Sequence, residues 1–227
     1  MKTSMILILG TLMATAAFSQ EKTPDKRLEH AANSLQAIQS SDKPIPPALL
    51  RKAQCVIIIP GLLKGAFLFG GKYGRGFTSC RTPRGWSAPA AMIIEGGSFG
   101  GQLGGSATDL IMLVMNRNGM DHLLHDKFTL GADLAVVQGI GYDASANADL
   151  FMRAPMISWS RSKGLFVGMS LEGASLRPDK GENRKLYGHD ITNQEILAKK
   201  TAPPRGARPF IAALNQFAPR VVKVKAK

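Results

Sequence analysis

The stretch Glu95–Asp109, EGGSFGGQLGGSATD, decides the fold class, and it directly follows the apolar run APAAMIIE. Its glycines place Ser98 in the Gly-x-Ser-x-Gly pattern of serine hydrolases. That pattern needs a strand, a sharp turn and then a helix, but the following GQLGGS disfavours a helix because each glycine costs about 1 kcal/mol there. Glycines within strands mark bulges, tight bends and close backbone approach instead. We therefore interpret the stretch as part of a strongly curved sheet and keep a Ser98 hydrolase as the weakest alternative.

Two further patterns of chemical interest are incomplete. The Gly-Lys pair at 71–72 is followed by Tyr73 rather than Ser or Thr, and Ala66 stands where a Walker-type phosphate loop has its first glycine. His122 and His125 are three residues apart and could share a helix face, but the sequence offers no evident third ligand for zinc. The sequence therefore predicts no catalytic residue, no metal site and no cofactor.

The first nineteen residues have the three parts of a secretory signal peptide. Lys2 gives a positive start, MILILGTLMA forms an apolar centre, and Ala17-Phe18-Ser19 is a small-x-small cleavage site. The apolar run is too short to span a membrane. We therefore expect cleavage near Ser19–Gln20 and a secreted or periplasmic protein, which could lie peripherally on a membrane.

Export changes the interpretation of the two cysteines, Cys55 and Cys80. In an oxidising compartment, a pair of cysteines more often forms a disulfide than a metal site or a catalytic thiol. Cys55 begins the first predicted strand and Cys80 ends the second arm of a hairpin, so neighbouring antiparallel strands could bring them together. We predict a Cys55–Cys80 disulfide, with two buried free thiols as the alternative.

The net charge of +13 favours anionic partners. Nucleic acid, an anionic membrane surface and acidic polymers all fit such a charge, and solubility alone is a further explanation. Because an exported protein does not normally meet nucleic acid, we expect no nucleic acid partner. Lipid headgroups and polymers of the cell envelope fit better.

The chain before Cys55 is predicted to contain a helix that begins at Thr23 and stops before SDKPIPP, followed by a short helix from Pro47 to Gln54. Thr23 can cap a helix, Pro24 suits its first position, and apolar residues recur at three- and four-residue spacing from Leu28 to Ile38. Lys26 and Arg27 put positive charge at the beginning of this helix. A face of this kind could supply partial insertion into a membrane surface.

From Cys55 onward, β-branched and aromatic runs alternate with Gly and Pro. The helical pattern between strands that a parallel doubly wound sheet needs is missing, so we predict an α+β, mostly β fold. It consists of a curved antiparallel sheet, barrel- or sandwich-like, with N-terminal and C-terminal helices. The expected parts are a signal peptide (1–19), N-terminal helices (20–54), a β domain (55–188) and a helical, basic C-terminal tail (189–227). Within the last part, Arg205–Lys227 carries six basic residues and no acidic one, and we expect it to be flexible.

Several long stretches together resemble the SYLF domain. They are GAFLFGGKYGRG, GWSAPAAMIIEGGSFGGQLGGSATDLIMLVMN, KFTLGADLAVV and SWSRSKGLFVGMSLEGASLRPD, in the order of the family. The resemblance runs from about Leu28 to Gly188. It implies a mostly β domain with no known enzymatic activity, binding of phosphoinositides and other anionic lipids, and, in fungal members, binding of actin.

The resemblance also suggests where lipid would bind. Lys72 and Arg75 match the family in the glycine-rich hairpin, and Arg161 and Lys163 match it in SRSKG. With the basic start of the first helix, the candidate lipid-binding residues are Lys26, Arg27, Lys72, Arg75, Arg161 and Lys163. The leading hypothesis is a non-enzymatic, secreted module that binds anionic membrane surfaces. The alternative is a structural or cell-envelope interaction protein that binds acidic polymers or a protein partner, including actin. The oligomeric state is left open.

Overall fold

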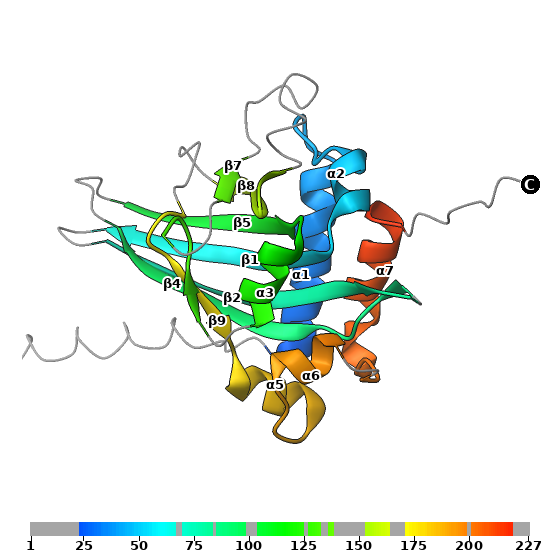
Figure 1. Cartoon of the computed structure of the whole chain (residues 1–227). Helices are drawn as coiled ribbons and strands as arrows, with labels where there is room; N and C mark the ends of the chain where they lie inside the picture. Colours follow the sequence, from blue (N-terminus) through cyan, green and yellow to red (C-terminus); the bar gives the residue numbers. More distant parts are fainter. Residues whose placement is uncertain are drawn as a thin grey trace, which may run out of the picture.

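A computed structural model describes residues 23–66, 70–83, 85–98, 104–124, 127–132, 136–138, 153–163, 171–198 and 201–219. The predicted signal peptide, residues 1–19, lies outside the described residues. Figure 1 shows a curled sheet whose long strands run past the helices that pack against it. The predicted α+β, mostly β class with N-terminal and C-terminal helices is therefore confirmed.

The helices are α1 (Pro24–Gln39), α2 (Pro47–Lys52), α3 (Arg117–Leu124), α5 (Lys180–Tyr187), α6 (Asn193–Ala198) and α7 (Arg208–Phe217), with the 3-10 turn η1 (Arg205–Ala207) before α7. The strands are β1 (Cys55–Ala66), β2 (Gly70–Thr82), β3 (Gly85–Trp86), β4 (Ala90–Ser98), β5 (Gly104–Val114), β6 (Phe128–Thr129), β7 (Val136–Gln138), β8 (Met156–Lys163) and β9 (Ser175–Pro178).

One sheet contains these nine strands of the described chain, in the order β6-β9-β4-β2-β1-β5-β8-β7, with β3 paired to β2. Neighbouring strands are antiparallel except for β7 and β8, which are parallel. The long strand β1 lies in the middle, between β2 and β5. The centre of the sheet is therefore built early in the sequence.

Helix α1 begins where the sequence predicts. Thr23 is the N-cap and its hydroxyl accepts the backbone N–H of Lys26 at 3.4 Å, while Pro24 occupies the first turn together with Asp25. The helix buries one stripe of residues, made up of Arg27, Leu28, Ala31, Ala32, Ser34, Leu35 and Ile38. This stripe fixes α1 against the sheet.

Each face of the sheet carries its own hydrophobic cluster, because side chains alternate along every strand. On one face Val56 and Ile58 pack with α1, α2 and α7. On the other face Ile57 and Ile59 pack with Leu123 of α3 and with residues of β6, β9 and α6. The strands near the centre are thus buried on both faces, and helices hold the curl of the sheet from either side (Figure 1).

A bulge bends β1 where it crosses β5. Ile59 pairs with Leu110 and Leu62 pairs with Thr108, so Pro60 and Gly61 together face the single residue Asp109 of β5. Gly61 adopts φ +59°, a conformation that glycine takes without steric cost. Its backbone N–H donates to Asp109 Oδ1 at 2.9 Å. The carboxylate thereby satisfies a donor that the bulge removes from regular pairing.

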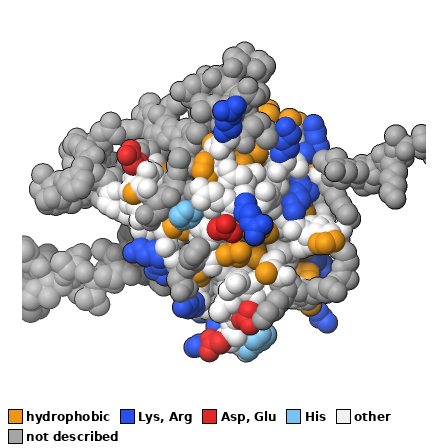
Figure 2. All heavy atoms as spheres, viewed as in Figure 1, with side chains coloured by type: hydrophobic (Ala, Val, Ile, Leu, Met, Phe, Trp, Pro, Cys, Tyr) orange, Lys and Arg blue, Asp and Glu red, His pale blue; other side chains and the backbone are white. Residues whose placement is uncertain are grey.

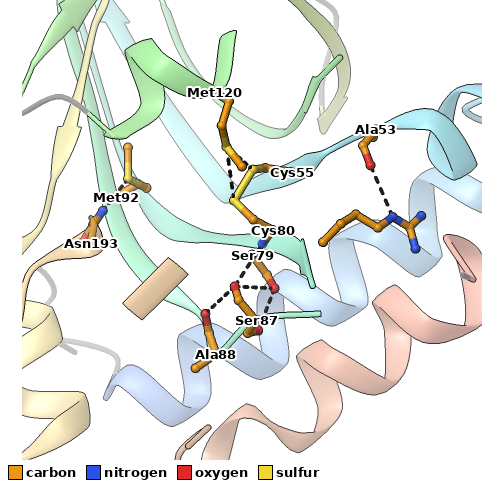
Figure 3. Close-up of a disulfide and its surroundings, with 10 residues drawn as sticks. Ala53, Cys55, Ser79, Cys80, Ser87, Ala88, Met92, Met120 and Asn193 are labelled. Carbon is orange, nitrogen blue, oxygen red and sulfur yellow. Dashed lines mark hydrogen bonds between the residues drawn. A yellow bond between two sulfur atoms is a disulfide. The ribbon is translucent and has the colours of Figure 1, made fainter. Parts of the chain in front are cut away.

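The predicted Cys55–Cys80 disulfide is confirmed. The two residues are direct register partners in the β1–β2 pair, and both are buried. Figure 3 shows Met120 of α3 over the bridge, with its Sδ 3.1 Å from Cys55 Sγ. The bridge therefore joins the two central strands under the cover of α3.

Replacing both Cys55 and Cys80 by alanine should destabilise the fold by about 3.5 kcal/mol. In the chain-entropy model this is the contribution expected for a bridge that closes a loop with a sequence separation of 25. Urea denaturation of the two proteins without reductant measures the difference. Two thiols open to alkylation in the unreduced, unfolded wild-type chain would contradict the bridge.

The C-terminal segment is helical, as predicted, but its helix packs into the core instead of forming a flexible tail. Residues 205–217 form η1 and α7, and α7 packs beside α1. Phe210 and Leu214 are fully buried, and the ring of Phe210 meets that of Phe77 of β2 edge-on at 6.2 Å between centroids. The amphipathic pattern of ARPFIAALNQF places this helix in the core despite its basic flanks. The end of the tail, residues 220–227, lies outside the described residues.

Candidate functional site

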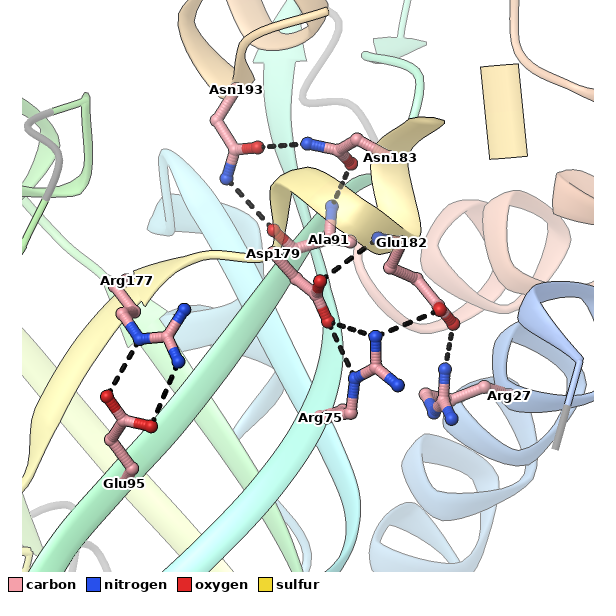
Figure 4. A network of polar contacts seen from close by, with 9 residues as sticks. All are labelled: Arg27, Arg75, Ala91, Glu95, Arg177, Asp179, Glu182, Asn183 and Asn193. Atoms are coloured by element: carbon pink, nitrogen blue, oxygen red, sulfur yellow. Dashed lines mark hydrogen bonds and ion pairs between the residues drawn. The ribbon is translucent and has the colours of Figure 1, made fainter. Parts of the chain in front are cut away.

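A buried ion-pair network joins α1, β2 and α5 (Figure 4). Arg27 of α1 pairs with Glu182 Oε1, and Arg75 Nη2 of β2 lies 3.1 Å from Glu182 Oε2. Arg75 Nε also donates to Asp179 Oδ2 at 2.6 Å. Glu182 is only 2 % exposed, so water contributes little to stabilising its carboxylate. The charge is compensated by the two arginines instead. The network fixes three elements that are far apart in the sequence.

Helix α5 presents Glu182 to this network because Asp179 caps its beginning. Asp179 Oδ1 accepts the backbone N–H of Glu182 at 3.0 Å, as the sequence DKGE permits. The next residue, Asn183, accepts the backbone N–H of Ala91 at 2.8 Å through its side-chain oxygen. Its side-chain nitrogen donates to Asn193 Oδ1 at 2.6 Å (Figure 4). The start of α5 is thus held to β4 and α6 by polar contacts that leave little room for movement.

A second ion pair lies between β4 and β9. Arg177 donates from Nε and Nη2 to the two carboxylate oxygens of Glu95, at 2.7 and 3.0 Å (Figure 4). The hydrogen bonds from Arg177 hold the pKa of the Glu95 carboxyl below its ordinary value, although partial burial acts in the opposite direction. The first residue of the stretch Glu95–Asp109 is therefore a cross-strand anchor.

Replacing Arg177 by glutamine should raise the pKa of Glu95. Because the pKa is lower in the folded than in the unfolded chain, the pair contributes stability above the unfolded pKa and loses it as the pH falls through the folded pKa. The variant should lack this part of the acid sensitivity. Carbon NMR titration of the carboxyl, assigned with Glu95→Gln, measures the shift. An unchanged pKa would mean that the pair does not persist in solution.

A groove lies between α1 and the outer part of the sheet, and we call it the α1 groove. Its volume is about 500 Å³. On the helix side its lining includes His30, Asn33 and Ala37, which recur at three- and four-residue spacing and so form one stripe of α1. On the sheet side the bulge residues Pro60 and Gly61 contribute to its floor. The bulge and the helix together give the groove its shape.

An outer band of side chains crosses the sheet along the floor of the α1 groove, and all of its members except Tyr73 line the groove. We define it as Tyr73 of β2, Leu63 of β1, Ala107 and Asp109 of β5, and Arg161 of β8. Leu63 is opposite Tyr73 on one side and Ala107 on the other, and Asp109 is opposite Arg161. Leu63 is 58 % exposed and Tyr73 47 %, and they are the exposed large hydrophobic residues among those that the structure describes. The outer band thus combines an apolar centre with a charged end.

Two of the six candidate lipid-binding residues meet in one place. Arg27 and Arg161, from α1 and β8, both line the α1 groove. Arg161 is exposed and has no ion-pair partner among the described residues, whereas Arg27 is held by Glu182. Arg75 is connected to Arg27 through the same carboxylate. The positive charges of Arg27 and Arg75 are therefore paired with carboxylates within the protein.

The other three candidates lie elsewhere. Lys72 is buried, with its Nζ 3.4 Å from the backbone oxygen of Glu172. Lys26 is exposed on the first turn of α1, and Lys163 is the last residue of β8, where its side chain lies outside the described part. Of the five candidate side chains that the structure describes, only Arg27 and Arg161 lie together at the α1 groove.

Sequence reasoning missed Leu63, Tyr73 and Glu182. The signal for Glu182 was available, because an aspartate three residues before a glutamate resembles the capping box of a helix start. Leu63 and Tyr73 carry no comparable signal, since apolar residues in a strand are normally buried. Their exposure follows from the length of β1 and β2, which run past the edge of α1 (Figure 1).

The alternatives weighed from the sequence fall in different places. Ser98 is the last residue of β4, and its side chain is not described. The ring of His122 lies against Phe128 with centroids 5.7 Å apart, and His125 lies outside the described residues. Among the residues placed in the structure, no three His, Cys, Asp or Glu side chains gather as a metal site would need. The described helices include none that is long and apolar enough to cross a bilayer.

The sequence is similar to that of a known protein family. A model of the family described as "Ysc84: Las17-binding protein actin regulator" matches residues 95–217, more than half of the chain. The chain belongs to the Ysc84 family. The SYLF resemblance found in the sequence is therefore confirmed. The match ends at the last residue of α7, which agrees with the packing of that helix in the core.

Relatives of this Ysc84-family chain occur in fungi and animals. It is 37 % identical to an SH3 domain-containing protein of Schizosaccharomyces pombe over 176 residues, which cover 75 % of this chain and 41 % of the relative. It is 34 % identical to LAS seventeen-binding protein 3 of Saccharomyces cerevisiae, covering 78 % and 40 % of the two chains. For the human SH3 domain-containing YSC84-like protein 1 the values are 34 %, 78 % and 52 %. The chain thus spans about half or less of the length of the relatives it matches.

Proposed function

We propose that this Ysc84-family chain is a non-enzymatic binding module for a protein partner of the actin system. The observation that carries the proposal is the family match, because the family is described as a Las17-binding actin regulator. Relatives with that binding in their names are 34 % identical to this chain over 78 % of its length. The buried acidic groups of the network are compensated by arginines, which suits a scaffold that presents a surface better than a set of catalytic acids and bases.

Co-sedimentation with purified actin filaments tests this proposal. The protein should pellet with filaments in a saturable manner and stay in the supernatant without them. A basic control protein of similar net charge is needed, because filaments attract cations without specificity. Binding that equals that of the control, or that disappears completely at physiological salt, would contradict the proposal.

Anionic membrane surfaces are a second candidate. Lysine and arginine side chains outnumber acidic ones on the face shown in Figure 2, and the net charge is +13. Lys26 and Arg161 are both exposed, and each basic group near an anionic surface contributes about 1 kcal/mol. Flotation with neutral and with phosphatidylserine vesicles at two salt concentrations tests this candidate. Equal recovery with both vesicle types would reject it.

We also propose that the protein is exported and loses residues 1–19, so that it would meet a partner of the actin system only outside the cell that makes it. The proposal rests on the tripartite pattern of the N-terminus. N-terminal sequencing of the mature protein tests it, and Gln20 is the expected first residue. A mature chain that still begins at Met1 would contradict export by this route.

A further inference from the structure

We propose that the outer band and the α1 groove form the docking surface for an acidic, amphipathic segment of the protein partner, with Arg161 as its charged anchor. This inference rests on the proposed function and adds the place and the chemistry of recognition. It follows from three features of the same surface: exposed apolar side chains, the shape of the groove, and an exposed arginine that forms no ion pair with a described residue.

The apolar part of the surface consists of side chains that normally lie inside a protein. Leu63 of β1 and Tyr73 of β2 are about half exposed, although Ile57, Ile58, Ile59 and Leu62 of β1 are fully buried. They are direct register partners, so their side chains stand next to each other on the same face. Contiguous exposed apolar residues of this kind mark interaction sites, and tyrosine is enriched among the residues that dominate binding.

The shape of the surface fits an elongated segment. Helix α1 forms one wall, with His30, Asn33 and Ala37 along it, and the floor runs from the bulge of β1 to β8. A volume of about 500 Å³ accommodates a few side chains of a segment that lies alongside α1. The apolar face of such a segment would rest on Leu63 and Tyr73. A lipid bilayer is flat on this scale and would contact the ridge of α1 rather than the floor of the groove.

The charge of the surface selects an acidic partner. Arg161 is exposed at the β8 end of the outer band without an ion pair to any described residue. Its register partner Asp109 already accepts the backbone N–H of Gly61, and its carboxylate offsets part of the local positive charge. The net charge of +13 still draws acidic segments toward the molecule. Arg27 adds no free charge to the groove, because Glu182 compensates it.

Fluorescence anisotropy with two labelled peptides tests the surface. One is a helical peptide of glutamate and leucine in amphipathic spacing, and the other has lysine in place of each glutamate. The acidic peptide should bind the full chain at least about tenfold more tightly than the basic one. Arg161→Glu should reverse this preference. Leu63→Ser or Tyr73→Ser should lower the affinity for the acidic peptide by about tenfold.

Arg117→Glu is the matched control, because it makes the same charge change at the exposed first residue of α3. A carboxylate is tolerated at a helix N-terminus, and α3 covers the opposite face of the sheet. This variant should bind the acidic peptide within about twofold of wild type. Thermal melting of each variant confirms that the fold is retained, since all four substitutions lie at exposed or partly exposed positions.

The outcomes separate the surface from the function. Equal binding of both peptides, or an acidic peptide that is unaffected by Arg161→Glu, overturns the docking surface. So does loss of anionic-vesicle binding in Arg161→Glu when neither peptide binds, because the surface would then serve lipid. Acidic-peptide binding that depends on Arg161, in a protein that fails to pellet with actin filaments, supports the surface and rejects the actin-system partner. Filament binding that Arg161→Glu leaves intact supports the function and rejects the surface.

Discussion

Replacing Gly76 by alanine should prevent the central strands from pairing and destabilise the fold by more than about 4 kcal/mol. A Cβ atom at this position of β2 would lie 1.9 Å from the backbone oxygen of Ile58 and 2.8 Å from the Cα of Ile59. Backbone atoms of a paired strand cannot rotate away as a flexible side chain can. The two strands must therefore separate where the sheet is buried on both faces. Loss of the cooperative urea transition, or failure to recover folded protein, is the expected result.

Gly97→Ala is the matched control on the adjacent strand β4. A Cβ atom there would have nothing within 4 Å, so the substitution should change stability by less than about 1 kcal/mol. A Gly76→Ala protein that unfolds at the same urea concentration as this control would show that β1 and β2 can move apart without cost.

Replacing Glu182 by alanine should destabilise the fold by about 3–5 kcal/mol. The substitution leaves the guanidinium groups of Arg27 and Arg75 without the carboxylate that both contact, and a buried charge without its partner is strongly unfavourable. Asp179 still contacts Arg75, so the charge of Arg75 keeps part of its compensation. The midpoint of urea denaturation measures the change.

Two further variants check this interpretation of the network. Asp190→Asn breaks the fully exposed pair with Arg184 and should have little effect, because solvent screens such pairs. Arg27→Met combined with Glu182→Leu should recover much of the loss, since apolar residues of similar volume can replace a buried pair. A double variant as unstable as Glu182→Ala alone would mean that packing around α5, not charge, causes the effect.

Much of the fold could be predicted because local signals agree with its long-range pairing. Thr23 and Pro24 define the start of α1, and the β-branched runs that follow Cys55 become β1, β2, β4 and β5. The pairing of the cysteines followed from their number and from strand adjacency. Glycine was correctly interpreted as a device for bending and close approach, as Gly61 in the bulge and Gly76 against β1 show.

The candidate site was harder to predict because the basic residues were treated as one group, regardless of the face of the sheet to which each side chain points. Lys72 and Arg75 are three apart on β2, and residues at odd spacing point to opposite faces of a sheet. Lys72 accordingly reaches Glu172, whereas Arg75 reaches α5. The partners of Arg75 come from more than one hundred residues later in the chain, and no local pattern indicates such a contact. Arg161 could be singled out only once its neighbours were known.

The central strands β1 and β2 lie near the beginning of the chain, and this limits which fragments can be transferred to another protein as a folded unit. The family match begins at Glu95, but β1 and β2, which precede it, separate β4 from β5 in the sheet. A fragment that starts at Glu95 would lack both strands and leave the facing edges of β4 and β5 unpaired, an arrangement prone to aggregation. It would also lack α1, against which α7 packs. The smallest portable unit therefore extends from the cap of α1 to the end of α7, and a fusion or a swap with a longer relative should be joined outside those two points.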